Sequence, residues 1–134
     1  ANWGLGEGVV SGESNTDMFL VDKRGFKVIE EKIGMKSKQM VSKEDGAVWE
    51  EVPLDKRTIP CLSKEEIIEI SKIALFLEER LGCPQDVEWA IEPGIDLPGS
   101  LFLLQTRPAK IAQKRVDSPE KSLIKILLNR MARK

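Results

Sequence analysis

The sequence has 134 residues, 41% hydrophobic and 32% charged, a composition typical of one folded domain or part of one and not of a disordered chain. Its 21 Lys and Arg residues nearly balance its 22 Asp and Glu residues, which argues against nucleic acid or an anionic membrane as the main partner. The lack of histidine excludes catalysis by a histidine base and zinc binding through histidine.

The N-terminal half of the sequence predicts a loop followed by two β-hairpins. Glycines at positions 4, 6, 8 and 12 predict a loop over residues 1–13. The apolar run within residues 16–23 and the alternating residues 26–29 flank Arg24-Gly25, so we expect these two segments to pair. Residues 38–43 and 47–52 flank Glu44-Asp45-Gly46, which is a second hairpin signal.

The strongest helical pattern lies at about residues 63–81. Ser63 and Glu66 have the spacing of a capping box, and apolar residues then recur at helical spacing. Gly82 and Pro84 follow, and both favour the end of a helix. We expect one face of this helix to pack on a sheet.

A third hairpin and a second helix are predicted after residue 84. Residues 86–91 alternate apolar and polar, residues 101–105 form their partner strand, and residues 92–100 form a long connection. Ser118 and Pro119 suit the start of a helix. Its apolar stripe comprises Leu123, Ile124, Leu127, Leu128 and Met131. The expected fold class is α+β, with an antiparallel sheet, a packed amphipathic helix and a C-terminal helix.

Three polar residues of the third hairpin are the candidates for chemistry. Glu88 lies in the first strand, and Gln105 and Arg107 lie two residues apart near the end of the second, so antiparallel pairing brings them side by side. Carboxylate and amide oxygens suit Mg²⁺, and a guanidinium suits a phosphate. These residues therefore indicate a site for a magnesium-bound nucleotide. Spacing alone favours a simpler interpretation, a cross-strand ion pair that contributes a fraction of a kcal/mol.

Five segments, in this order, carry a family resemblance that reverses this preference. They are GLGEGVVSG at 4–12, FLVDK at 19–23, IPCLSKEEI at 59–67, GCPQDVEWAI at 82–91 and LLQTRP at 103–108. Together they resemble the nucleotide-binding domain of the phosphoenolpyruvate synthase (pyruvate, water dikinase) and pyruvate, phosphate dikinase family. The QDVEWA and LQTRP pair is the most specific part, and Asn15-Thr16-Asp17 departs from the usual Thr-Pro-Asp.

The resemblance implies an ATP-grasp-like fold, with ATP and Mg²⁺ as cofactors. It implies that Glu88 and Gln105 bind the metal and that Arg107 acts as the catalytic, phosphate-contacting arginine. Phosphoryl groups would pass from ATP to a histidine on another domain and then to pyruvate. Spacing does not decide the acceptor, and a phosphotransferase with a different acceptor remains an alternative.

The resemblance also predicts how the chain is organised. Residues 1–110 would be the C-terminal lobe of the ATP-binding domain, and residues 111–134 a linker with an amphipathic helix. We expect a cytoplasmic fragment or split subunit, weakly active or inactive alone, whose partners are ATP, an N-terminal lobe and a phosphohistidine domain. The alternative is a non-catalytic interaction module that binds a partner lobe or self-associates as a homo-oligomer. Neither nucleic acid nor a membrane is an expected partner.

Other features have plain structural interpretations. We expect the glycines at 4, 6 and 8 to form a tight loop in preference to a phosphate cradle, and the two cysteines to be packed thiols without a C-x-x-C motif. Lys32, Lys36, Lys38 and Lys43 are expected to be solvated. Trp3, Trp49 and Trp89 are expected to pack in the core or between lobes, in preference to stacking on adenine.

Overall fold

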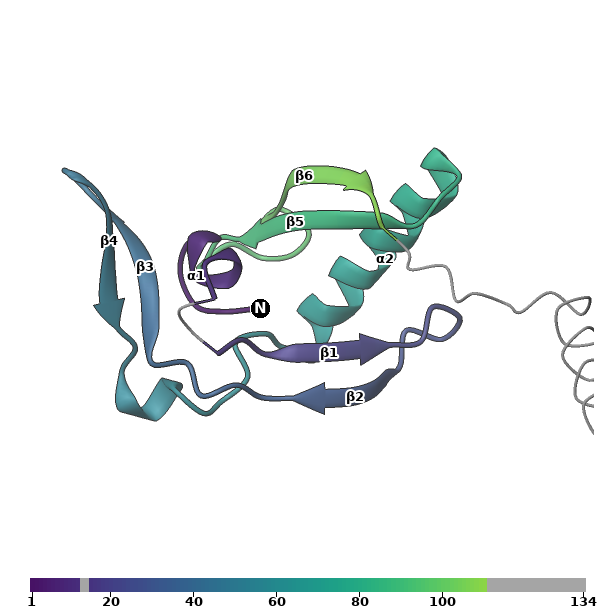
Figure 1. The fold of residues 1–134 in the computed structure, drawn as a ribbon. Helices are drawn as coiled ribbons and strands as arrows, with labels where there is room; N and C mark the ends of the chain where they lie inside the picture. Colours follow the sequence, from purple (N-terminus) through teal and green to yellow (C-terminus); the bar gives the residue numbers. More distant parts are fainter. Residues whose placement is uncertain (13–14, 111–134) are drawn as a thin grey trace, which may run out of the picture.

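A computed structural model describes residues 1–12 and 15–110 (Figure 1). Its elements, in chain order, are α1 (Glu7–Val10), β1 (Met18–Val21), β2 (Val28–Lys32), β3 (Lys38–Lys43), β4 (Gly46–Glu51), the 3₁₀ turn η1 (Leu54–Lys56), α2 (Lys64–Leu81), β5 (Gln85–Ile91) and β6 (Leu101–Pro108). This arrangement confirms the α+β class. The predicted helix after Ser118 lies outside the described residues. Within the described residues, no helix has the length and apolar character needed to cross a membrane.

The strands form three separate antiparallel pairs: β1 with β2, β3 with β4, and β5 with β6. Figure 1 shows the β5–β6 hairpin above the β1–β2 hairpin, with α2 rising from beside β1 to the far end of β5, while β3–β4 extends away from the rest. The three expected hairpins are therefore present, but the described residues contain no larger sheet that joins them.

Helix α2 begins and ends at the residues that its sequence predicts. The Ser63 hydroxyl accepts a hydrogen bond from the Glu66 backbone N–H at 3.2 Å, and the Glu66 carboxylate accepts one from the Ser63 N–H at 2.6 Å. This capping box satisfies donors that the first helical turn leaves unpaired. Gly82 ends the helix with φ of 72°, a conformation that glycine adopts without strain.

The N-terminal segment and the first hairpin differ from the sequence-based expectation. The glycine-rich segment contains a single helical turn, α1, where a loop was expected. The return strand of the first hairpin begins at Val28, two residues later than predicted, because the turn between Asp22 and Lys27 is wider. The Asp22 carbonyl accepts a hydrogen bond from Phe26, whose φ is +50°.

The apolar core of the described residues is small. Val52 and Ile67 are buried, at 1% and 6% exposure, while large apolar side chains on several elements remain open to solvent. Phe76 on α2, for example, is 53% exposed. With so few buried apolar side chains, much of the apolar surface of α2 and of several strands stays exposed.

Candidate functional site

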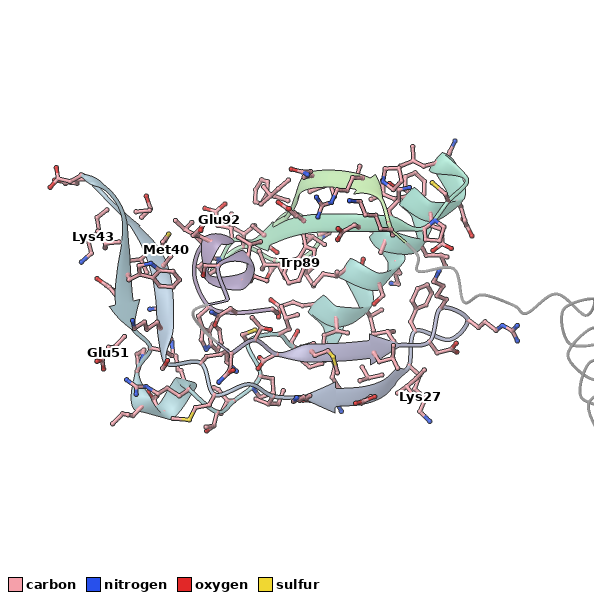
Figure 2. The ribbon with its side chains drawn as sticks, in the orientation of Figure 1. Lys27, Met40, Lys43, Glu51, Trp89 and Glu92 are labelled. Atoms are coloured by element: carbon pink, nitrogen blue, oxygen red, sulfur yellow. The ribbon has the colours of Figure 1, made fainter. Side chains whose placement is uncertain are left out.

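The site residues lie on the β5–β6 hairpin, whose two faces differ in character. On β5, Gln85, Val87, Trp89 and Ile91 are half-buried, while Asp86, Glu88 and Ala90 are exposed. Figure 2 shows Trp89 on the inner side of the hairpin, where it lines a groove with Ile70 and Ile73 of α2. The acidic residues therefore occupy the opposite, solvent-facing side of the strand.

A β-bulge determines which β6 residues share that outer face. The register pairs Trp89 with Leu103 but Glu88 with Gln105, so Leu104 is an extra residue on β6. Without this extra residue, strict alternation would place Gln105 on the same side as Leu103, toward α2. The bulge instead allows Leu103 to face the helix while Gln105 faces outward beside Glu88.

The structure thus brings the three predicted residues together on one exposed strand face. Glu88 is directly opposite Gln105, and Arg107 belongs to the next outward-facing pair, opposite Asp86. Directly opposite residues of an antiparallel pair project from the same face. Among the described residues, neither the Glu88 carboxylate nor the Gln105 amide has a hydrogen-bond or ion-pair partner, so their oxygens are available to a ligand.

The partner of Arg107 is Asp86, a residue that the sequence interpretation had not assigned a role. Asp86 Oδ2 accepts a hydrogen bond from Arg107 Nε at 2.9 Å and forms an ion pair with Nη2 at 2.8 Å. The side chains are 53% and 63% exposed, so the pair contributes a fraction of a kcal/mol to stability. Its effect is to orient the guanidinium, whose Nη1 donors point to no partner among the described residues. The expected cross-strand ion pair exists, but its acid is Asp86 and not Glu88.

The described residues offer few ligands of their own for a metal ion. They contain no group of three or more acidic, cysteine or histidine side chains placed to hold one. Glu88 and Gln105 supply one carboxylate and one amide oxygen from directly opposite positions. This small set of hard oxygen donors fits Mg²⁺, which commonly takes one or two protein ligands and completes its shell with phosphate oxygens and water.

The glycine-rich N-terminal segment serves a structural purpose here. Gly4 bridges to Met40 of β3, and the Met40 carbonyl accepts a hydrogen bond from Leu5 N at 2.7 Å. A Cβ on Gly4 would lie 2.2 Å from the Met40 carbonyl oxygen. The backbone N–H groups of residues 8–11 bond to carbonyls within the segment. These contacts support the tight-loop interpretation over a phosphate cradle.

A buried ion pair beneath the N-terminal segment was missed by sequence reasoning. Lys36 is completely buried, so its expected solvation is wrong, and its ammonium contacts Asp17 Oδ1. Asp17 is 2% exposed and also accepts hydrogen bonds from Gly34 N at 2.9 Å and Cys61 N at 2.8 Å. One carboxylate thereby joins three segments that are far apart in the sequence. The available signal was Asp17 itself, an acid directly before an apolar run.

This network changes the pKa of two groups. Burial acts to raise the pKa of Asp17, but the Lys36 ammonium and the backbone N–H groups of Cys61 and Gly34 outweigh burial and hold it below its usual value. Burial, together with the Asp17 carboxylate, raises the pKa of the Cys61 thiol to about 12. Cys61 is therefore a packed, unreactive thiol, as expected.

The tryptophans also take part in packing. Trp3 Nε1 donates to the Lys56 carbonyl at 3.1 Å, and the Lys56 ammonium lies 5.8 Å from the Trp3 ring centre. The Trp49 ring lies beside Gly8 of α1, and Trp89 lines the groove against α2. These contacts favour the packing interpretation for all three rings.

Comparison with known proteins agrees with the resemblance of the motifs. The family described as "Pyruvate phosphate dikinase, AMP/ATP-binding domain" matches residues 1–126. A probable phosphoenolpyruvate synthase of Methanocaldococcus jannaschii is 40% identical over 115 residues, which are 85% of this chain and 9% of that protein. A second, of Methanothermobacter thermautotrophicus, is 36% identical over 95% of this chain and 18% of its own length. An uncharacterized phosphotransferase of Bacillus subtilis is 37% identical over 90% of this chain and 14% of its own length. The chain therefore spans less than a fifth of these curated relatives, and it belongs to the family of pyruvate phosphate dikinase AMP/ATP-binding domains.

Proposed function

We propose that this chain is part of an ATP-grasp-like domain that binds Mg²⁺-ATP in a phosphoenolpyruvate synthase-like phosphotransferase. The observation that carries the proposal is the outer face of β5–β6, where Glu88, Gln105 and Arg107 lie on two successive outward-facing cross-strand pairs. The family is defined by AMP/ATP binding, and two of the relatives carry the name phosphoenolpyruvate synthase.

In this proposal Glu88 and Gln105 hold Mg²⁺ through one oxygen each. The unpartnered state of both side chains among the described residues supports this role, because neither must break an existing bond to take a ligand. The bound ion would neutralise negative charge on the phosphoryl group during transfer.

Arg107 is proposed to contact the phosphates and to act as the catalytic arginine. Asp86 holds Nε and Nη2, which leaves the Nη1 edge of the fork for a phosphate oxygen. A guanidinium fixed before the ligand arrives loses less conformational freedom on binding than a free one.

The remaining steps involve polypeptide beyond the site described here. We propose that phosphoryl groups pass from ATP to a histidine of another domain, and then to pyruvate or a related acceptor. This chain has no histidine, so the accepting residue lies outside it. We also place the protein in the cytoplasm, since its two thiols are free in the structure and suit a reducing compartment.

The test is a titration of the full chain with ATP and Mg²⁺, followed by amide NMR. Glu88, Gln105 and Arg107 should show the largest shifts, and Glu88→Gln should remove the magnesium dependence. Glu50→Gln, on the distant β3–β4 hairpin, is the matched control and should leave the titration unchanged. The shifts should grow when the N-terminal part of the ATP-binding domain of a relative is added.

No response at these residues, with or without that added lobe, contradicts the proposal. Equal effects of the Glu88 and Glu50 variants would also contradict it, because the magnesium dependence would then not arise from this face.

A second candidate function is a non-catalytic interaction module, and the exposed apolar side chains of α2 and β6 favour it. It predicts an assembly that is insensitive to ATP. A monomer in sedimentation, alone and with the added lobe, would exclude it. If the chain self-associates through the apolar stripe of the predicted C-terminal helix, Leu127→Glu should weaken self-association.

A further inference from the structure

The candidate site exists in only one of two registers of β6 against β5. In the observed register, which contains the bulge at Leu104, Gln105 lies opposite Glu88. A regular ladder without the bulge would place Leu104 opposite Glu88 and Gln105 opposite Val87. Every later residue of β6 would then change face, so Gln105 and Arg107 would turn toward α2. The geometry of the site therefore depends on what favours the bulged register.

One side-chain hydrogen bond on the inner side of the hairpin distinguishes the two registers. Thr106, between the two site residues of β6, donates from its hydroxyl to Gln85 Oε1 at 3.1 Å. In the observed register Thr106 lies opposite Val87, on the same face as Gln85. In the regular register Thr106 would lie opposite Asp86 on the outer face, and its hydroxyl would point away from Gln85. The bond therefore forms only when the bulge is present.

The Gln85 side chain is also held at its other end. Its Nε2 donates to the Cys83 carbonyl at 2.9 Å and to Cys83 Sγ at 3.1 Å. Cys83 directly follows Gly82, which ends α2, and Gln85 lines the two grooves beside that helix. Both polar ends of the amide have partners, so the acceptor offered to Thr106 is fixed relative to α2.

The ladder is weak at the end where this bond lies. The Ala109 N–H donates to the Pro84 carbonyl at 2.8 Å, next to the pair of Gln85 with Pro108. Pro84 has no N–H to give in return, so this pair has one backbone hydrogen bond where an ordinary hydrogen-bonded pair has two. A side-chain bond beside such an end contributes a larger share of what fixes the register.

We propose that Thr106 and Gln85 are positioning residues of the candidate magnesium site. Their hydrogen bond stabilises the bulged register, and the register directs Gln105 and Arg107 outward beside Glu88. Neither positioning residue touches the ligand. The effect on magnesium rests on the proposed function, whereas the effect on strand pairing does not.

The test removes the Thr106 hydroxyl and then restores it, in the full chain. Thr106→Val keeps a β-branched side chain without the hydroxyl, and Thr106→Ser keeps the hydroxyl. Gln85→Met is a second variant, which removes the acceptor and keeps an unbranched side chain. Thr58→Val, at an exposed threonine outside the hairpin, is the matched control.

NMR gives two readouts for each variant. The first is the hydrogen-exchange rate of the Gln105 and Arg107 amides without ligand. The second is the Mg²⁺ concentration that half-saturates the Glu88 shift in the presence of ATP. The valine and methionine variants of the bonded pair should each raise both values about two- to tenfold, the effect of one net hydrogen bond. The serine variant and the control should stay close to the native values.

Unchanged values in Thr106→Val would overturn the proposal, and so would equal effects of valine and serine at this position. Faster exchange with an unchanged Mg²⁺ response would overturn it as well, because the bond would then stabilise the hairpin without positioning the site. If the native chain shows no Mg²⁺ response, the proposed function fails, and the exchange rates still decide whether the bond holds the strand pairing.

Discussion

Replacing Asp17 with Asn tests the buried ion pair. Asn keeps the size of the side chain and one acceptor oxygen, but it removes the charge opposite Lys36. Because Lys36 has 0% exposure, its ammonium would then have neither water nor a carboxylate to offset the cost of burial. The substitution also weakens the acceptor for the backbone N–H groups of Gly34 and Cys61.

Removal of one partner of a buried ion pair typically costs about 3–5 kcal/mol. With an m-value of about 2 kcal/mol/M, this loss lowers the urea midpoint by roughly 1.5–2.5 M. A small domain has a free energy of unfolding of about 5–15 kcal/mol, so the variant should lie close to the limit of folding.

The assay is urea unfolding of the full chain, followed by far-UV circular dichroism. Asp45→Asn, at the exposed β3–β4 turn, is the matched control and should change the free energy of unfolding by no more than about 0.5 kcal/mol. Lys36→Met should also destabilise, and the double variant should lose less than the sum of the two single losses, because no buried charge is left alone. A loss below about 1 kcal/mol for Asp17→Asn would refute the role assigned to the pair.

Three further predictions follow from the same contacts. The pKa of Asp17 is lower in the folded chain than the unfolded value of about 3.9, so the ionised carboxylate stabilises the fold above that pH. This stabilisation is lost as the pH falls through the folded pKa. The free energy of unfolding should therefore fall more steeply with acid in the native chain than in Asp17→Asn. With a pKa of about 12, a fraction of about 10⁻⁴ of the Cys61 thiol is ionised at pH 8. In a Cys83→Ala variant, a maleimide should therefore label Cys61 slowly in the folded chain and rapidly in urea. Gly4→Ala, at φ +78° and 2.2 Å from the Met40 carbonyl oxygen, should cost about 1–3 kcal/mol in urea unfolding, whereas Gly6→Ala, with open space around it, should be far milder. Equal losses in the two glycine variants would contradict the close approach.

The elements that sequence reasoning predicted well are those determined by neighbouring residues. The capping box at Ser63, the αL glycine at position 82 and the Asp-Gly turn at 45–46 all act over a few residues, and the structure confirms the helix and hairpin that they indicate. Strand alternation also predicts that Glu88 faces outward. Gln105 shares that face only because of the bulge at Leu104, which no local sequence pattern indicates.

The features that sequence reasoning missed depend on contacts between distant segments. Lys36 reads as one of several surface lysines, and only the fold brings it to Asp17, 19 residues away. Arg107 reads as a partner of Glu88, but the register places Asp86 opposite it. The division of the strands into three pairs is likewise a matter of long-range arrangement, which alternation within a strand does not specify.

The most direct test of the proposed site replaces Mg²⁺ with paramagnetic Mn²⁺ in the presence of ATP and records the NMR line widths of the full chain. The account predicts that the amides of Glu88 and Gln105 broaden first, that Arg107 follows, and that the β3–β4 hairpin is spared. Broadening centred on the glycines of the N-terminal segment, or spread evenly over the acidic residues of the surface, would contradict it.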